Sequence, residues 1–371
     1  MGWRGRILLC VSVALCVGCA GPSTSIPGLS SDEVASERRK QQIFQIQNYF
    51  SQLARLINVS HRLTLANRAD CKEAVAPRLG LFSIAAHELP DRYKGLAAEA
   101  LNLDADKSTV LSMAEGGPAA KAGISVGDVL LAFNGEDLPG EKPSEWIEAF
   151  LKRNGNRPVR IDVKRSGKKQ TYTVPTVTAC SIPILLKTDD QLNAFTDGRR
   201  IVIHSGILRV AQTDAELAVI VGHELAHVTM GHLRKLEQNR AAGTVGGAIV
   251  DIGLALLGVN TGGAFMRSLG DAGANAYATD FEREADYVGV YYVARAGYDT
   301  STSEKIWRSL AQESPKQIFY AGLHPTSPER FLLIQKANEE IADKKRRNVP
   351  LVPEAKPSQV SSVSETASAP N

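Results

Sequence analysis

Apolar residues recur at intervals of three or four in the segment from Asp32 to Leu65, separated by charged and polar residues. Such spacing collects the apolar side chains on one face of an α-helix. The pattern predicts one or two amphipathic helices that pack on the body of the protein, within a helical segment spanning 32–70. The apolar positions are Ile43, Ile46, Phe50, Leu53, Leu56 and Ile57.

The pattern changes between Cys71 and Cys180, where short runs rich in β-branched residues alternate with glycine, proline and Asn-Gly. Runs of this length bounded by turn residues are typical of strands. Residues 71–180 are therefore predicted to form a small β-rich domain. Its candidate strands are 109–112, 129–133, 159–164 and 170–174.

Helical periodicity returns after Thr213. The sequence Thr213-Asp-Ala-Glu216 has the form of a capping box, which starts a helix by satisfying its first backbone N–H groups. A second helical segment contains Phe281-Glu-Arg-Glu-Ala-Asp286 and ends near Gly297. The first helix is predicted to be a core helix, because its buried stripe comprises Leu217, Ile220, Val221, Leu225 and Val228.

Neither end of the chain shows this patterning. Arg4 and Arg6 precede the apolar run 7–17, which has the form of a secretory signal and is too short to span a bilayer comfortably. We therefore expect residues 1–18 to be a signal peptide and 19–31 to be a linker. Residues 348–371 are rich in proline, serine and alanine, and are predicted to be a disordered tail.

The length and composition are those of a soluble globular protein. With 371 residues, the chain has room for two modest domains and appendages. The net charge of +3, with 43% hydrophobic and 22% charged residues, provides no strongly basic field. Nucleic-acid binding is therefore excluded as the function.

Cysteine usage fits an exported protein. Leu15-Cys-Val-Gly-Cys19 resembles a bacterial lipoprotein signal, which would make Cys19 a lipid anchor, and the following Ala20 favours the outer membrane. Plain secretion or a retained anchor are the alternatives. Cys71 and Cys180 remain in the mature chain, where an oxidising compartment would allow a disulfide. Two buried free thiols are the alternative.

The segment His223-Glu-Leu-Ala-His227 is the main candidate for chemistry. Residues four apart share one face of a helix, so both imidazoles can reach one zinc ion. Glu224 is then placed beside a water molecule that the metal activates. His232, five residues beyond His227, is off this register and is predicted to pack or to face solvent.

Zinc in a catalytic site needs a third protein ligand and one open position. Glu282 is the candidate ligand, and Asp286, four residues later on the same helix face, is predicted to orient a ligand histidine. Glu284 points elsewhere, and we expect it to be a solvent-facing or ion-paired carboxylate.

His223-Glu-X-X-His227 followed by Glu282-X-X-X-Asp286 resembles the gluzincin metallopeptidases, the family that includes HtpX, the CAAX prenyl endopeptidases and BepA. The resemblance extends from about Leu186 to Phe331. It implies an α+β fold in which residues 181–347 form a zincin-type domain of packed helices with a small antiparallel sheet. It also implies one zinc ion per chain and peptide-bond hydrolysis.

Two further segments take roles from this resemblance. Asn193, Ala194 and Phe195 would lie on or beside an edge strand that pairs with extended substrate backbone. His324 would lie near the metal, where it either stabilises the oxyanion of the tetrahedral intermediate or ligates the zinc in a resting state. The alternative is that His324 is a capping histidine in a loop, with no role in the site.

Residues 117–135 resemble the PDZ domains of bacterial proteases. Leu79, Gly80 and Leu81 stand where such domains place the loop that receives a peptide's terminal carboxylate, and 145–151 would form the helix beside the groove. The alternative is a degenerate PDZ module that serves only as a spacer.

The glycine-rich and aliphatic segment 241–265 has three interpretations. Asp251, Asn260 and the many glycines argue against a membrane span. A buried or interfacial helix is the second interpretation. The glycine density favours the third, a mobile helix and loop that covers the active-site cleft.

The sequence as a whole predicts a zinc-dependent endopeptidase of the bacterial cell envelope. The resemblances and the predicted export imply a lipid-anchored periplasmic enzyme that cleaves misfolded or unassembled envelope proteins, with a peptide or C-terminal tail bound at the PDZ groove. In this mechanism Glu224 takes a proton from water and passes it to the leaving amine. The alternatives are a non-enzymatic chaperone or scaffold with a structural zinc site, and an adaptor that hands peptides to another protease. An intact Glu224 argues against a structural site.

Overall fold

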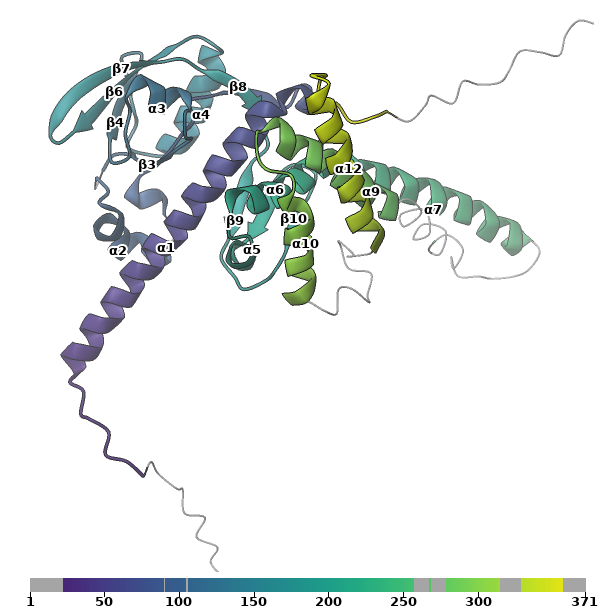
Figure 1. Cartoon of the computed structure of the whole chain (residues 1–371). Coiled ribbons are helices and arrows are strands. Elements are labelled where there is room, and N and C mark those ends of the chain that lie inside the picture. Colours follow the sequence, from purple (N-terminus) through teal and green to yellow (C-terminus); the bar gives the residue numbers. More distant parts are fainter. Residues whose placement is uncertain are drawn as a thin grey trace, which may run out of the picture. The chain divides into compact units, whose positions relative to one another are not determined.

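The computed structural model of the chain describes residues 23–89, 91–104, 106–256, 267, 278–313 and 328–355 (Figure 1). The chain divides into two compact units, Met1–Gln42 and Ile43–Asn371. Helix α1 (Ser31–Ala66) begins in the first unit, where Ser30 and Glu33 cap its N-terminus through reciprocal hydrogen bonds. The amphipathic pattern of this segment thus forms one long helix.

Within the second unit, helix α1 packs through its apolar face. Ile46 and Phe50 are buried in a cluster with residues of α2 (Asp91–Leu101). Leu56 and Leu63 are buried in the main core, together with residues of the helices that follow the β-rich segment. The apolar face therefore serves two separate cores.

The β-rich segment folds around an antiparallel sheet with the strand order β2-β3-β4-β6-β7, and β5 pairs with β4. Phe133, Leu130 and Ile161 are fully buried at its centre. The four predicted strands are confirmed as β3, β4, β6 and β7. In addition to α2, the elements are η1 (Arg68–Cys71), β1 (Val75–Arg78), β2 (Leu81–Ile84), η2 (Ala86–Glu88), β3 (Thr109–Met113), α3 (Pro118–Ala122), β4 (Val129–Phe133), β5 (Glu136–Asp137), α4 (Pro143–Asn154), β6 (Val159–Arg165), β7 (Lys168–Val174) and β8 (Val177–Cys180).

A disulfide and a strand pair close the base of this segment. Strand β1 pairs antiparallel with β8, with Val75 opposite Cys180, and the Cys71 and Cys180 sulfur atoms are bonded. The bond closes a loop with a sequence separation of 109 residues. In the chain-entropy model, a loop of this length stabilises the folded state by about 4–5 kcal/mol.

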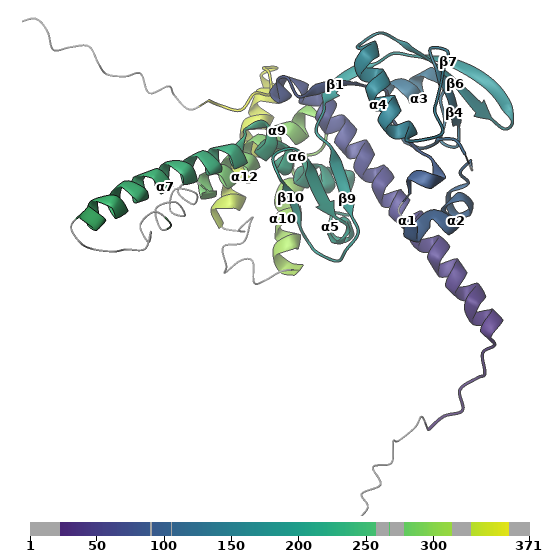
Figure 2. The same cartoon turned by 180° about the vertical axis from the view of Figure 1, so that it is seen from behind.

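The remainder of the second unit consists of helices around a small sheet with the order β10-β11-β9 (Figure 2). The β10 and β11 pair is antiparallel, as predicted, whereas the β11 and β9 pair is parallel. The α+β prediction is confirmed. The elements are β9 (Ile184–Lys187), β10 (Ala194–Thr196), β11 (Ile201–His204), α5 (Ser205–Val210), α6 (Asp214–Thr229), α7 (His232–Leu256), α9 (Ala278–Arg295), α10 (Thr302–Glu313) and α12 (Pro328–Arg346).

Helix α6 begins with the predicted capping box. The Thr213 hydroxyl accepts a hydrogen bond from the Glu216 backbone N–H, and the Glu216 carboxylate accepts one from the Thr213 N–H. Lys305 also pairs with Glu216 at 2.8 Å. The capping carboxylate thus fixes the start of α6 and links it to α10.

Helices α6 and α9 cross at two glycines. A Cβ atom added at Gly289 would lie 3.0 Å from the backbone nitrogen of His223 and 3.1 Å from its Cα. One added at Gly222 would lie 3.1 Å from the Gly289 carbonyl oxygen. Because the blocking atoms belong to backbone, neither position has room for a side chain. The glycines therefore let the two backbones touch.

The first part of the predicted disordered tail is ordered, contrary to the prediction. The Lys344 ammonium donates a hydrogen bond to the Val352 carbonyl at 2.5 Å, and the Glu354 N–H donates to the Tyr287 hydroxyl at 2.9 Å. These contacts with α12 and α9 supply the binding energy that the composition of the tail lacks. Residues 356–371 lie outside the described part of the chain.

Helix α7 contains the first part of the glycine-rich segment, residues 241–256, and the structure does not describe 257–265. Among the residues that the structure describes, no helix combines the length and the apolarity needed to cross a membrane.

The glycine crossing generates a prediction. Substituting Gly289→Ala forces α6 and α9 apart, and we expect it to lower the free energy of unfolding by about 1–3 kcal/mol. Gly95→Ala in α2, where a Cβ meets nothing within 4 Å, is the control and should be neutral or stabilising by up to ~1 kcal/mol. Thermal unfolding of both variants measures the difference. An unchanged midpoint for Gly289→Ala would contradict the tight crossing.

Candidate metal centre

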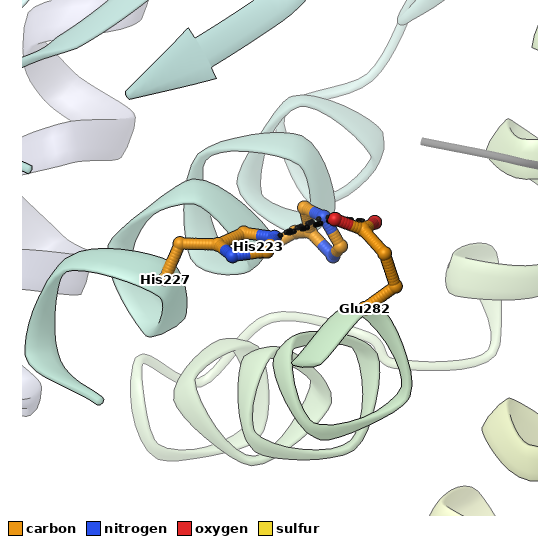
Figure 3. A group of neighbouring side chains, drawn as sticks. All are labelled: His223, His227 and Glu282. Atoms are coloured by element: carbon orange, nitrogen blue, oxygen red, sulfur yellow. Dashed lines mark hydrogen bonds and ion pairs between the residues drawn. The ribbon is translucent and has the colours of Figure 1, made fainter. Parts of the chain in front are cut away.

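Three side chains converge between helices α6 and α9 (Figure 3). The Nε2 atoms of His223 and His227 are 3.1 Å apart. Glu282 places one carboxylate oxygen 3.5 Å from the His223 Nε2 and the other 3.3 Å from the His227 Nε2. Two ligands that each lie about 2.0–2.1 Å from one tetrahedral zinc ion are separated by about 3.3 Å. The donor atoms of the three residues therefore fit a single zinc ion.

The surroundings of this group also suit a metal. His223 and His227 are buried and Glu282 is only partly exposed. Bringing two imidazoles and a carboxylate together away from water is costly unless a cation compensates. Three protein ligands also leave the fourth tetrahedral position for water or a substrate atom.

Glu224 lies beside the ligands on helix α6 but is not one of the three. Its side chain is buried, and its charge raises the pKa of His227 by its proximity, although burial lowers that pKa more strongly. A buried carboxylate next to the ligands is placed to exchange protons with a molecule in the fourth position.

A buried ion pair holds the far side of His223. The His223 Nδ1 lies 2.9 Å from Asp286, whose same oxygen accepts a hydrogen bond from Arg330 at 2.7 Å. Arg330 is itself stacked on the Trp307 ring, 3.6 Å from its centroid. A carboxylate at this distance favours the tautomer with the proton on the His223 Nδ1, which would leave Nε2 available for a metal.

The charges around His223 alter its pKa. Burial disfavours the charged ring, but the hydrogen bonds and charges of Asp286 and Glu282 outweigh burial and raise the pKa of His223 to about 9. Burial raises the pKa of Asp286, but the Arg330 charge and the His223 hydrogen bond outweigh burial and hold that pKa below its usual value. Burial and the neighbouring His223 lower the pKa of His227.

His232 contacts the other ligand histidine, which the sequence did not indicate. It is fully buried, its Nδ1 lies 2.9 Å from the His227 Nδ1, and its Nε2 lies 2.9 Å from Glu284. Of the two alternatives predicted for His232, the structure shows packing and not exposure to solvent. Its contact with His227 was not predicted, because helix α6 ends at Thr229 and the register argument stops there. Gly231, at φ +67°, then turns the chain back toward the ligands.

The other predicted site residues fall into two groups. Asn193 directly precedes β10, which contains Ala194 and Phe195 and packs against α6. Strand β10 is at the edge of its sheet among the described residues. Cys19 and His324 lie outside the described part of the chain, so the structure does not place them.

The predicted PDZ loop lines a cavity of about 310 Å³. Leu79, Gly80 and Leu81 are among its lining residues, together with Ile147 and Leu151 of α4 and with residues of α1. Gly80 adopts φ +71°, a left-handed conformation that suits glycine.

The fold and the His-His-Glu group define a metallopeptidase-type domain. Residues 179–338 match the family model described as Peptidase family M48, and residues 109–165 match the model described as PDZ domain. The chain therefore contains an M48-family peptidase domain together with a PDZ domain, as the two resemblances implied.

Similar proteins carry peptidase names. The chain is 31% identical over 142 residues to the beta-barrel assembly-enhancing protease of Yersinia pestis, covering 35% of this chain and 28% of that protein. It is 27% identical over 158 residues to the mitochondrial metalloendopeptidase OMA1 of Arabidopsis thaliana, covering 42% of this chain and 31% of that protein. The match thus spans less than a third of the length of either relative.

Among solved structures, the chain is similar to the HtrA3 PDZ domain bound to a phage-derived ligand. The identity is 20%, the TM-score is 0.22, and the match covers 28% of this chain and 88% of that one.

The raised pKa of His223 generates a prediction about metal affinity. At pH 7 the metal-free ring holds a proton that zinc must displace, since a ligand histidine is neutral. With a pKa of about 9, the apparent zinc affinity is expected to rise about tenfold per pH unit up to about pH 9 and then level off.

Chelator competition at a series of pH values measures this dependence. Asp286→Asn is the matched control, because it removes a group that raises the pKa of His223 and should flatten the slope. An affinity of the unaltered chain that stays constant between these pH values would contradict the assignment.

Proposed function

We propose that this chain is a zinc-dependent endopeptidase of the bacterial cell envelope that cleaves misfolded or unassembled envelope proteins. The observation that carries the proposal is the convergence of His223, His227 and Glu282, with Glu224 buried beside them. The M48 domain and the names of the relatives support a peptidase. The substrate class rests on the predicted export signal and on bacterial relatives such as the beta-barrel assembly-enhancing protease of Yersinia pestis.

The residues divide the work of hydrolysis. His223, His227 and Glu282 would hold the zinc ion, which when bound supplies a Lewis acid for the scissile carbonyl and for water. Glu224 would accept a proton from the attacking water and deliver it to the leaving amine. Asp286 and Arg330 would keep the His223 ring in its ligating orientation.

The edge strand β10 is the proposed substrate-binding element. Its antiparallel partner β11 occupies one side, so an extended peptide could add to the other side through backbone hydrogen bonds. Such pairing reads little sequence, which suits a protease for unfolded chains. His324, which we expect near the metal, would either stabilise the oxyanion or occupy the open position in a resting state.

The PDZ domain and the export signal complete the proposal. The cavity beside Leu79, Gly80 and Leu81 is proposed to take the C-terminal end of a peptide. Cys19 is proposed to anchor the protein to the outer membrane, with its domains in the periplasm.

The catalytic assignment predicts different defects for two carboxylates. Glu224→Gln should keep zinc bound and reduce cleavage of an unfolded protein by about 100- to 10,000-fold, because it removes only proton transfer. Glu282→Ala should lose zinc as well, because it removes a ligand. Metal analysis and casein cleavage measure both, with the exposed Glu237→Gln on α7 as a control that should behave like the unaltered chain.

Three results would count against this assignment. Full activity in Glu224→Gln would show that Glu224 is not the group that accepts the proton from water, whereas no cleavage by the unaltered chain would favour a non-enzymatic chaperone with a structural zinc site. Full zinc occupancy in Glu282→Ala would show that another residue is the third ligand.

The PDZ assignment predicts selective peptide binding. A peptide with an apolar last residue and a free carboxylate should bind, and its amidated form should bind at least about tenfold more weakly, because the loop N–H groups lose their charged acceptor. Ile147→Asp should weaken binding by placing a charge in the apolar part of the cavity. Fluorescence anisotropy measures both. Equal affinity for the two peptide forms would favour the spacer interpretation.

A further inference from the structure

The turn between helices α6 and α7 brings a second histidine behind the ligand His227. The chain leaves α6 at Thr229 and turns at Gly231, and α7 begins with His232. This turn points the His232 ring at His227 from the side opposite the other ligands, with 2.9 Å between the two Nδ1 atoms.

The contact on the other side of His232 is with helix α9. The His232 Nε2 lies 2.9 Å from a carboxylate oxygen of Glu284, two residues after the ligand Glu282. The Phe281 ring stacks on the His232 ring, with centroids 4.8 Å apart and 17° between the planes. His232 is fully buried and its contact with His227 is made away from water, whereas Glu284 on its other side is partly exposed.

Proton counting gives each ring one arrangement. If the His227 Nε2 donates its lone pair to a metal, the single proton of the neutral ring is on Nδ1. That proton can be donated only to an unprotonated Nδ1 of His232. The proton of His232 is then on Nε2, where it is donated to the Glu284 carboxylate. A doubly protonated His232 would set two N–H groups against each other.

We propose that His232 and Glu284 are positioning residues that fix the tautomer and ring orientation of His227 and so increase the affinity of the centre for zinc. The proposal rests on the proposed function of this metal centre. It parallels the contact of Asp286 with His223, but here a neutral ring separates the carboxylate from the ligand. Each zinc-binding histidine would then be held at its second nitrogen by an acceptor from outside α6.

Packing alone is the competing role for His232, and three variants separate the two roles. His232→Phe keeps a flat ring against Phe281 but removes the acceptor for the His227 N–H. Glu284→Ala removes the last acceptor at a partly exposed position, where folding is least at risk. Glu284→Gln keeps an oxygen that can accept from His232.

The test measures zinc affinity of the full chain by chelator competition, together with the visible absorption spectrum of the cobalt-substituted protein. We expect His232→Phe and Glu284→Ala to weaken zinc binding about 10- to 100-fold, and Glu284→Gln to weaken it less. The cobalt spectra of the first two should shift, because the ligand ring changes its orientation.

Glu340→Ala on α12 is the control for a general loosening of α9. Glu340 accepts hydrogen bonds from Tyr287 and Tyr291 of α9 and is not in contact with the three ligands in the described contacts. Its loss should lower the melting temperature and leave zinc affinity unchanged. A similar loss of zinc affinity in Glu340→Ala would show that loosening of α9 is enough to weaken zinc binding. That result would overturn the positioning role of His232 and Glu284.

The remaining outcomes are also decisive. Zinc affinity within twofold of the unaltered chain and an unchanged cobalt spectrum in both His232→Phe and Glu284→Ala would overturn the proposal. If His232→Phe fails to fold, Glu284→Ala decides alone. If the unaltered chain binds no zinc, the proposed function itself fails, and the positioning role of His232 and Glu284 fails with it.

Discussion

The contact between the backbones of α6 and α9 at Gly222 and Gly289 is the constraint on which the centre depends. Packed helices are ordinarily held apart by their side chains, at interaxial distances of about 8–10 Å. Here a Cβ atom at either glycine would meet backbone atoms of the other helix. His223 is the next residue after Gly222, so the spacing of the helices directly sets how far its ring lies from Glu282. The remaining contacts refine a geometry that this crossing establishes.

Much of this centre could be predicted because its information is local. His223 and His227, and likewise Glu282 and Asp286, are four residues apart, and helical periodicity alone places each pair on one face. The capping box at Thr213 and the four strands of the β-rich segment are also encoded in short windows. The contributions of Arg330 and His232 could not be predicted in this way. Arg330 contacts Asp286 from α12, a helix that is distant in the sequence. His232 lies beyond the end of α6, so helical periodicity does not relate it to His227. The order of residues 348–355 likewise depends on α9 and α12, which composition cannot reveal.

The PDZ domain occupies its place in the chain without dividing the peptidase core. Leu63, before the domain, and Ile182, after it, are buried in the same cluster. The β1 and β8 pair and the bond between Cys71 and Cys180 bring the two ends of the inserted segment together. An inserted domain whose two ends lie close together disturbs the surrounding peptidase core little, because the core chain continues almost as if the domain were absent. Helix α1 therefore packs with helices that follow it by more than a hundred residues.

The start of helix α7 at His232 has a mechanical consequence. The residue that contacts the back of His227 is the first residue of a helix that extends to Leu256. A displacement of the far end of α7 would be transmitted along the helix to the His232 ring at its start. The coordination of a bound metal would then depend on the orientation of α7. A molecule that bound the helix far from the centre could alter the metal's coordination without touching any ligand.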